Sequence, residues 1–156
     1  MPGVDGVGVV APVGAGVDIP LGTRVAYHQS LSRDGSFAEY CLVDAYLLMQ
    51  LPATIDDSVA AAVPCPAITA WQALAKVPPG ASSDVLVIGA GGAVGFYLAQ
   101  LAGQRGLRVW ATAGPQHHAA LKALGLVDVF DYHNAQWQAQ LQTALGERPL
   151  HALFDT

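Results

Sequence analysis

The chain contains Val85-Leu-Val-Ile-Gly-Ala-Gly-Gly-Ala-Val-Gly95, an apolar run that ends in a glycine-rich turn. Residues 85–88 predict a short strand buried on both faces, and the residues after Gly95 have the apolar spacing of a helix. A strand, a glycine turn and a helix form the first half of a βαβ unit. Such a turn directs free backbone N–H groups and the positive end of the helix dipole toward one point, where a pyrophosphate can bind.

The glycine pattern departs from the commonest dinucleotide fingerprint at one position. Its spacing is Ala90-x-Gly92-x-x-Gly95, with Ala where the first Gly usually stands. A strand precedes the turn, a helix follows it, and the next strand pattern, residues 107–112, begins where a βαβ unit would return. The alternative is a turn that is rich in glycine only because it packs tightly. The complete unit favours dinucleotide binding.

Composition and charge exclude several classes of protein. The 156 residues carry a net charge of −5, and the seven Lys and Arg residues form no basic run, which argues against a nucleic-acid partner. The sequence begins without the pattern of a signal peptide, and its apolar runs are too short to span a membrane. Cys41 and Cys65 form no metal-type pair. We therefore expect a cytoplasmic protein with reduced thiols and no membrane partner.

Two segments of different character divide the chain at Pro52. Residues 1–52 are β-rich and suggest a small barrel or sandwich. A polar loop is expected over residues 30–36. Strands are predicted at residues 7–11, 24–27, 37–43 and 47–51.

Residues 53–156 alternate helices and strands, which is typical of a parallel sheet with helices on both faces. Helices are expected at 58–63 and 67–75, separated by a break at Pro64-Cys-Pro66. Trp71, Trp110 and Trp137 are interpreted as core residues. The sequence ends two residues after a predicted strand, so we expect a piece of a longer protein. The remaining predicted elements are strands at 85–88, 107–112, 127–130 and 150–154, and helices after Gly95, at 116–124 and at 135–145.

Four stretches carry a resemblance to a known family. They are Pro2-Gly-Val-Asp-Gly-Val-Gly-Val-Val10, Leu21-Gly-Thr-Arg-Val-Ala26, Gly35-Ser-Phe-Ala-Glu-Tyr40, and residues 61–74 leading into the glycine loop. In their order and spacing the chain resembles the medium-chain dehydrogenase/reductase superfamily, in particular its zinc-independent quinone oxidoreductase branch. The resemblance implies an α/β protein with a partial chaperonin-10-like β-barrel domain at 1–52 and a partial Rossmann domain, a doubly wound parallel sheet, at 53–156. It also implies a homodimeric full-length form about twice as long.

The resemblance bears on metal binding. Zinc members carry Gly-His-Glu where this chain has Gly3-Val4-Asp5, and valine cannot bind a metal. Cys65 falls near a zinc-ligating cysteine of those members, but a catalytic zinc needs three protein ligands. We therefore expect no metal, and interpret Cys65 as a small buried residue. A zinc-type alcohol dehydrogenase relative remains the alternative.

No residue stands out as the catalytic acid. Asp5, His28 and Tyr40 are candidates by residue type alone, and each also fits a structural role. The resemblance implies direct hydride transfer from the nicotinamide to a small quinone or α,β-unsaturated carbonyl.

The second strand of the predicted Rossmann unit indicates the cofactor. NAD-specific sites place an acid at the end of this strand, whereas here it reads Ala111-Thr-Ala-Gly-Pro-Gln116. The lack of an acid favours NADPH over NADH. His117 is either a phosphate ligand or, with His118, a solvated residue of the first helical turn. The predicted cofactor-binding residues are Thr69, Ala90, Gly91, Gly92, Ala93, Val94, Gly95, Thr112, Gly114, His117 and Tyr132.

Two of these residues enter through the resemblance. Thr69 matches the family segment Leu-Thr-Ala-Tyr/Trp, which lies beside the nicotinamide, and its alternative role is helix capping or packing. Tyr132 matches a tyrosine near the adenosine phosphate, and its alternative is an ordinary aromatic residue after a strand.

Three hypotheses for function follow from the sequence. The first is an NADPH-dependent oxidoreductase acting on quinones or α,β-unsaturated carbonyls. The second is an NADPH-binding module without catalysis. The third is a truncated product with no activity of its own.

Overall fold

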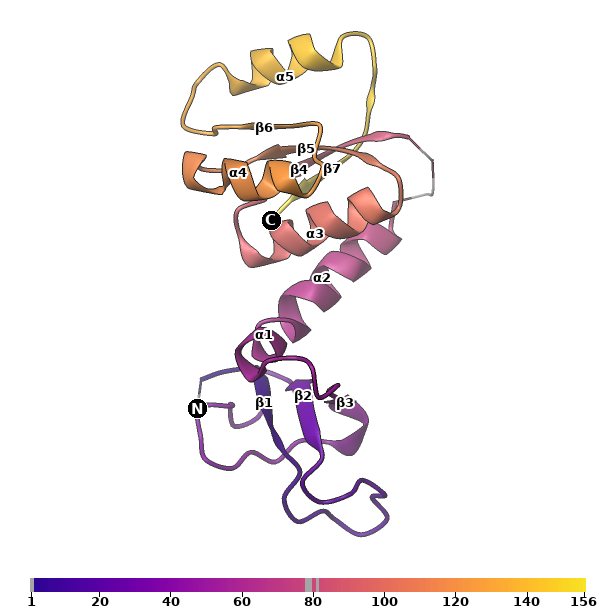
Figure 1. Ribbon diagram of the computed structural model, residues 1–156, viewed down its shortest axis with the longest axis vertical. Helices are drawn as coiled ribbons and strands as arrows, with labels where there is room; N and C mark the ends of the chain where they lie inside the picture. The colour runs from indigo at the N-terminus through magenta and orange to yellow at the C-terminus, as the bar shows by residue number, and fades with distance from the viewer. Residues whose placement is uncertain (1, 78–79, 81) are drawn as a thin grey trace. The chain divides into compact units, whose positions relative to one another are not determined.

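The computed structural model describes residues 2–77, 80 and 82–156 (Figure 1). The chain forms two compact units, Met1–Cys65 and Pro66–Thr156. Among the described residues, no helix combines the length and the apolar character needed to cross a bilayer.

The first unit is built on a three-stranded antiparallel sheet. Its strands are β1 (Asp5–Val9), β2 (Arg24–His28) and β3 (Leu48–Gln50), in that spatial order. A short 3-10 helix, η1 (Ala45–Leu47), precedes β3. The central strand β2 supplies the buried residues Val25, Ala26 and Tyr27. The Tyr27 ring lies against Gly6 of β1 so closely that a Cβ there would overlap it. Three of the four predicted strands are confirmed, with β1 beginning two residues before its predicted start at Val7.

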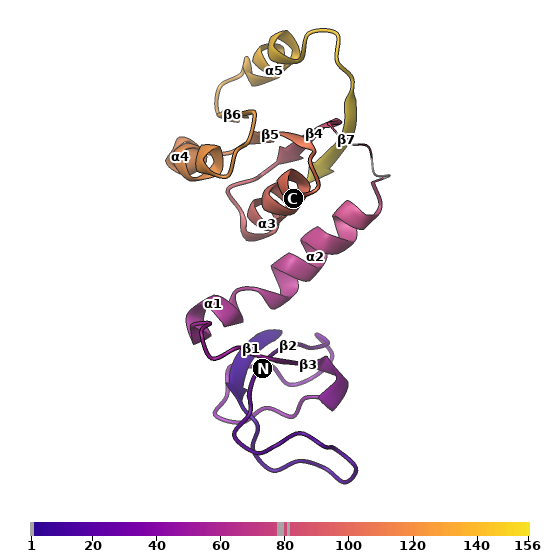
Figure 2. The same ribbon diagram turned by 45° about the vertical axis from the view of Figure 1, so that its right-hand side comes forward.

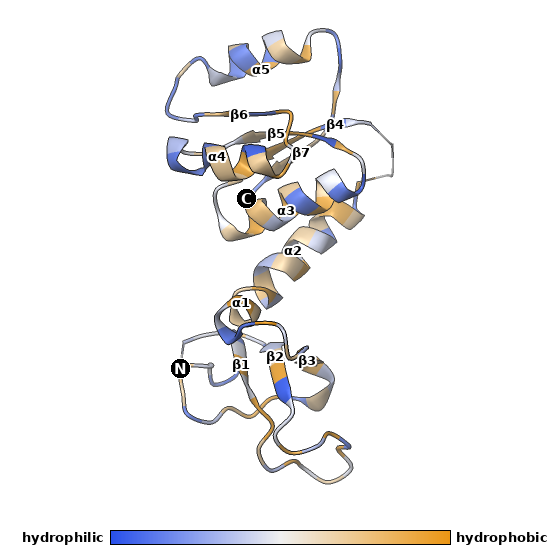
Figure 3. Cartoon of the chain, in the orientation of Figure 1, coloured by the Kyte–Doolittle hydropathy of each residue, from blue (hydrophilic) through white to orange (hydrophobic). Residues whose placement is uncertain are grey.

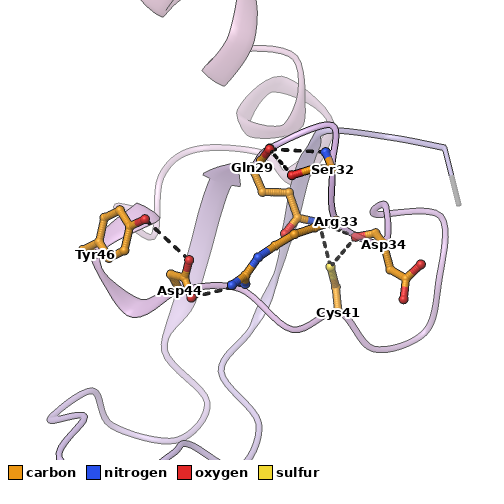
Figure 4. A network of polar contacts seen from close by, with 8 residues as sticks. Gln29, Ser32, Arg33, Asp34, Cys41, Asp44 and Tyr46 are labelled. Carbon is orange, nitrogen blue, oxygen red and sulfur yellow. Dashed lines mark hydrogen bonds and ion pairs between the residues drawn. The ribbon is translucent and has the colours of Figure 1, made fainter.

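The predicted strand at 37–43 is wrong. Phe37, Tyr40 and Leu42 are 74%, 81% and 85% exposed, so the segment buries no apolar face against the sheet. It belongs instead to a long loop, residues 29–44, in which side chains contact one another (Figure 4). Gln29 Nε2 donates to the Asp34 carbonyl (2.6 Å) and to Cys41 Sγ (3.2 Å).

A second contact in the same loop is ionic. Arg33 pairs with Asp44 at 3.2 Å, and the Tyr46 hydroxyl donates to the other carboxylate oxygen of Asp44 at 3.5 Å (Figure 4). The loop is thus held by side-chain contacts and by two backbone bonds, from the Ser36 and Phe37 N–H groups to the Gly3 and Pro2 carbonyls, rather than by a β ladder.

Helix α1 (Asp57–Ala61) packs with the first unit. Arg24 of β2 explains this, because its guanidinium donates to the Ile55 carbonyl (2.7 Å) and pairs with the Asp57 carboxylate. Ala60 is buried on the same side. The division between Cys65 and Pro66 therefore lies beyond the boundary predicted at Pro52.

The second unit is a four-stranded parallel sheet. Its strands are β4 (Asp84–Ile88), β5 (Arg108–Thr112), β6 (Asp128–Phe130) and β7 (Leu150–Asp155), in the spatial order β6-β5-β4-β7. The helices are α2 (Pro64–Ala75), α3 (Ala93–Gln104), α4 (Pro115–Ala123) and α5 (Trp137–Leu145). The predicted alternation of strands and helices is confirmed.

The helices cover both faces of this sheet (Figures 1 and 2). On one face, apolar residues of α2, α3 and α4 pack on Val85 and Val87 of β4. On the other face, Leu141 and Leu145 of α5 pack on Leu86 and its neighbours. Alternate residues of one strand thus face two different cores, which explains the continuous apolar run at 85–88. Helix α5 carries both hydrophilic and apolar residues, as the hydropathy colouring shows (Figure 3), and its apolar residues Leu141 and Leu145 are the ones that pack on the sheet.

Two predictions about α2 are wrong. The break between the two predicted helices falls at residues 62–63, and α2 begins at Pro64 rather than at residue 67, because proline is tolerated in the first turn, where its missing N–H has no intrahelical partner. Trp71 is not a core residue: it is 57% exposed, and the Arg105 guanidinium lies 5.1 Å from its ring centroid. Ala70 and Leu74 take the buried positions of this helix.

Trp110 lies in the core of the second unit as predicted, whereas Trp137 is partly buried and packs against that core. Trp110 is buried, stacks on Phe130, and donates its indole N–H to Asp84 at 2.6 Å. Arg108 and Arg148 each approach the Asp84 carboxylate at 3.4 Å. The buried charge of Asp84 is therefore both hydrogen-bonded and paired.

Tyr27 provides a pH-dependent test of the first unit. Burial, followed by a hydrogen bond and a charge interaction with Cys41, raises the pKa of Tyr27 to about 12 from 10.0. Between pH 10.0 and about pH 12 the unfolded chain loses the Tyr27 phenol proton while the folded chain keeps it. The free energy of unfolding should therefore be unaffected below about pH 10 and fall as the pH rises toward 12.

Absorbance titration of the tyrosines should show a late ionisation that Tyr27→Phe removes. Tyr46→Phe, which changes a ring 83% exposed, is the control and should retain the late step. Persistence of that step in Tyr27→Phe would contradict the assignment.

Candidate nucleotide-binding site

The glycine loop joins the carboxyl end of β4 to the amino end of α3. Gly89 turns the chain with φ +77°, a conformation that favours glycine. Gly92 is the N-cap residue of α3, in extended conformation, and has no side chain with which to cap the first turn. The first-turn amides of Ala93, Val94 and Gly95 have no intrahelical acceptor. An exposed, uncapped helix start of this kind fits an anionic ligand such as a pyrophosphate.

Gly95 is required by the packing of α3 against the loop. A Cβ at this position would lie 2.5 Å from the Gly89 carbonyl oxygen and 2.8 Å from both Ala90 Cα and Thr156 Oγ1. Two of these three atoms belong to the backbone and cannot rotate away. Gly95, the last glycine of the Ala-x-Gly-x-x-Gly pattern, therefore sets how closely α3 approaches the end of β4.

Neighbouring strands hold the loop in place. The Gly89 N–H donates to Thr112 Oγ1 (3.3 Å), and the Ala90 N–H donates to the Thr112 carbonyl (2.9 Å). On the other side, the Thr156 hydroxyl donates to the Ile88 carbonyl at 2.9 Å. Thr112 is fully buried, so its hydroxyl holds the glycine loop from the interior of the unit. Sequence reasoning missed Thr156, whose contact depends on the pairing of β7 with β4.

His117 lies at the glycine loop. A Cβ at Gly91 would be 2.5 Å from His117 Cδ2, so the imidazole rests against the loop backbone. Gly114 is the N-cap of α4, and Pro115 follows at its first position. The start of α4 and the start of α3 thus lie at the same edge of the sheet. His118 differs from His117, because its Nε2 bonds to the Ala113 carbonyl at 3.0 Å.

Among the described residues, no hydrogen bond or ring contact joins Thr69 or Tyr132 to the glycine loop or to His117. Thr69 is exposed on α2. Tyr132 is 50% exposed in the turn after β6, and its ring centroid is 4.2 Å from that of His133. The same turn is fixed by Asp131, whose pKa is lowered chiefly by hydrogen bonds from the His133 backbone and ring. The cofactor roles of both residues stay predictions.

A second cluster of functional side chains lies in the first unit. Asp5 and His28 are directly paired across β1 and β2, and His28 Nδ1 lies 2.7 Å from Asp5 Oδ1. The Cys65 N–H donates to both carboxylate oxygens of Asp5 at 3.2 Å. One potential ligand atom from each of Asp5, His28 and Cys65 lies within 4.8 Å of the others.

No sequence motif predicts this grouping, because it depends on the register of β1 and β2. Asp5 and His28 entered the sequence analysis separately as acid candidates, and Cys65 as a buried packing residue. Cys65 is in fact only partly buried. Tyr40, the remaining acid candidate, is 81% exposed.

Comparisons with known proteins extend this picture. No protein-family model matches the sequence. The chain is 32% identical over 161 residues to a trans-enoyl reductase of Aspergillus terreus, covering 92% of this chain and 53% of that protein. It is 33% identical over 157 residues to a quinone oxidoreductase of Rattus norvegicus, covering 99% of this chain and 47% of that protein.

A solved structure agrees with these relatives. A mycobacterial protein complexed with NADPH has a TM-score of 0.83 and 31% identity, covering 97% of this chain and 48% of its own. Over nearly its whole length the chain is similar to proteins of the medium-chain dehydrogenase/reductase superfamily. It spans about half the length of the relatives that it matches.

The donor set of the first unit differs from the pattern of the zinc-binding proteins that the chain resembles. Val4, which stands at the histidine position of zinc members, offers no ligand atom. Asp5, His28 and Cys65 nevertheless supply an oxygen, a nitrogen and a sulfur close together. These residue types fit a borderline divalent ion such as Zn²⁺.

Gly95→Ala tests the packing of the loop. The added methyl group must displace backbone, so we expect a loss of about 1–3 kcal/mol in the free energy of unfolding and weaker NADPH binding. Gly103→Ala is the matched control, since it lies in the same helix with nothing within 4 Å of its Cβ. It should be neutral or stabilise by about 0.5–1 kcal/mol. Urea unfolding and NADPH fluorescence titration measure both effects, and equal behaviour of the two variants would contradict the packing argument.

Proposed function

We propose that the protein is an NADPH-dependent oxidoreductase that reduces quinones or α,β-unsaturated carbonyls without a metal. The observation that carries the proposal is the glycine loop between β4 and α3, with its uncapped first helical turn. The quinone oxidoreductase and trans-enoyl reductase relatives support the reaction class. The NADPH complex of the mycobacterial structure supports the cofactor.

The chain's own residues would divide the binding of NADPH between two helix starts. The first-turn amides of Ala93, Val94 and Gly95 would bind the pyrophosphate. The end of β5 carries no acid, so nothing there repels a 2′-phosphate. His117, beside Gly91, would donate a hydrogen bond to that phosphate. Thr69 and Tyr132 would contact the nicotinamide and adenosine ends.

In this proposal NADPH supplies a hydride, and the protein holds the acceptor in position. Val4 supports a reaction without zinc, since it removes one ligand of the superfamily's zinc pattern. The cytoplasmic location and the homodimeric full-length form are parts of the same proposal.

Turnover assays test the proposed reaction. NADPH oxidation should occur with at least one member of a panel of quinones and enones, and it should persist after treatment with EDTA. The assay should use this chain and the product of its complete reading frame. Saturable NADPH binding without turnover in either form would contradict the reductase and favour the binding module. Loss of turnover in EDTA, restored by zinc, would contradict the metal-free reaction.

His117 provides a test of cofactor choice. His117→Ala should raise the Kd for NADPH by about tenfold, the effect of losing one hydrogen bond to a charged group, and leave the Kd for NADH unchanged. His117→Lys should restore or strengthen NADPH binding, because lysine is always charged at neutral pH. His151→Ala, on the exposed face of β7, is the control. An equal change in the two Kd values for His117→Ala would contradict a phosphate contact.

A further inference from the structure

A cavity of about 440 Å³ lies at the amino edge of the parallel sheet, where β4, β5 and β7 begin. Because the strands are parallel, this edge is opposite the one that carries the glycine loop. The length of β4, roughly 13 Å for its five residues, separates the two. The cavity lies entirely within the second unit. Its polar lining residues are Ser82, Ser83, Asp84, Arg108, Arg148 and His151.

Two guanidinium groups share one carboxylate in this cavity. Asp84 is buried, and Arg108 Nε and Arg148 Nε each lie 3.4 Å from a different oxygen of its carboxylate. The Trp110 indole N–H donates to the same carboxylate at 2.6 Å. Three donors therefore satisfy Asp84, while the two arginines carry one positive charge more than this carboxylate balances. The surplus charge makes the cavity attractive to an anion.

Several donors in the cavity remain available to a ligand. Among the described residues, no hydrogen bond is found from the Nη atoms of Arg108 or from the Ser82 and Ser83 hydroxyls. Arg148 Nη2 donates to the Ala144 carbonyl at 2.9 Å, which leaves Nη1 available. The Arg108 and Arg148 side chains are 37% and 43% exposed, so a ligand can reach them from solvent. The planar N–H fork of a guanidinium group matches the oxygens of a phosphate group.

The backbone before β4 holds the two serines beside Arg108. Among the described residues, Ser82 is the one non-glycine residue with positive φ, at +64°. Its N–H donates to the Gly106 carbonyl at 3.1 Å, and the Arg108 N–H donates to the Ser83 carbonyl at 2.9 Å. Residues held in this conformation cluster at ligand sites, which agrees with the charge and the free donors of the cavity.

We propose that this cavity binds a phosphate group, either as inorganic phosphate or as the ester of a small molecule. The Nη atoms of Arg108 and Arg148 donate to the phosphate oxygens, and the Ser82 and Ser83 hydroxyls supply further donors. Asp84 is a positioning residue, because it holds both guanidinium groups from the interior of the unit. The site lies apart from the glycine loop and does not rest on the hydride transfer proposed above.

NMR titration of the full chain with inorganic phosphate tests this site. At an ionic strength kept constant with chloride, the Nε–H signals of Arg108 and Arg148 and the amide of Ser83 should shift together and saturate, with a Kd near or below about 1 mM. Arg108→Gln should raise this Kd about tenfold or more. Arg33→Gln is the matched control and should leave it unchanged, because Arg33 is 43% exposed and paired with one carboxylate but belongs to the first unit.

A second titration distinguishes the two sources of the phosphate group. Pro149 and Leu150 add apolar surface to the cavity. Phenyl phosphate, a monoester with an apolar group, should bind more tightly than inorganic phosphate if the ligand is an ester, and equally tightly if it is the free ion. Both results support the site, and the difference between them identifies its ligand.

The remaining outcomes can overturn the proposal. Shifts that do not saturate, or that chloride alone reproduces, would do so. Shifts confined to residues 91–95 would place the phosphate at the glycine loop and would also overturn it. Circular dichroism checks the fold of each variant.

If Arg108→Gln does not fold, Ser82→Gly decides, because glycine adopts positive φ without strain. A Kd raised about threefold or more, the effect of losing one hydrogen bond, supports the site, and a smaller change overturns it. Because neither NADPH nor an acceptor is present, failure here is distinct from failure of the reductase proposal.

Discussion

The close approach of α3 to the end of β4 is the contact on which the second unit depends. Gly95 leaves no room for a side chain between the helix and the loop backbone. This contact directs the first turn of α3 toward the carboxyl edge of the sheet, where β5 and β7 hold the loop through Thr112 and Thr156. The position of one helix thus determines where unpaired amides become available to an anion.

The two units offer different chemistry. The second unit presents backbone groups and one imidazole around a glycine turn, which suits a large anionic cofactor. The first unit presents side-chain ligands of three kinds on a small antiparallel sheet. In the first unit the register of the strands brings the groups together, whereas in the second unit consecutive residues of the glycine turn supply most of the groups and strand order adds His117.

The parts that sequence reasoning predicted correctly are those with local causes. The strand at 85–88, the glycine turn and the following helix show a period and a spacing that need no distant partner. The strand expected at 37–43 failed because its alternating pattern has no sheet to bury it, as the exposure of Tyr40 shows. The second helix was expected to start at residue 67 but starts at Pro64, because a first-turn proline costs a helix little.

The same distinction between local and distant causes holds for the candidate site. The glycine loop followed from spacing, and the place of His117 followed from the end of β5. The buried role of Thr112 and the contact of Thr156 required knowledge of which strands are neighbours. The pairing of Asp5 with His28 required the register of a hairpin whose connection spans residues 10–23. Long connections leave register unspecified in the sequence, because no tight turn fixes it.

The loop at 29–44 influences the dynamics of the first unit. It is held by a few side-chain bonds and by two backbone bonds to Pro2 and Gly3, and among the described residues the buried Gln29 Oε1 has no hydrogen-bond partner. Opening the loop therefore sacrifices little buried apolar contact and gives Gln29 access to water. We expect such a segment to open as a low-stability foldon, with amides that exchange with solvent long before those of β2. On this expectation the loop can open while the strands of the first unit stay paired.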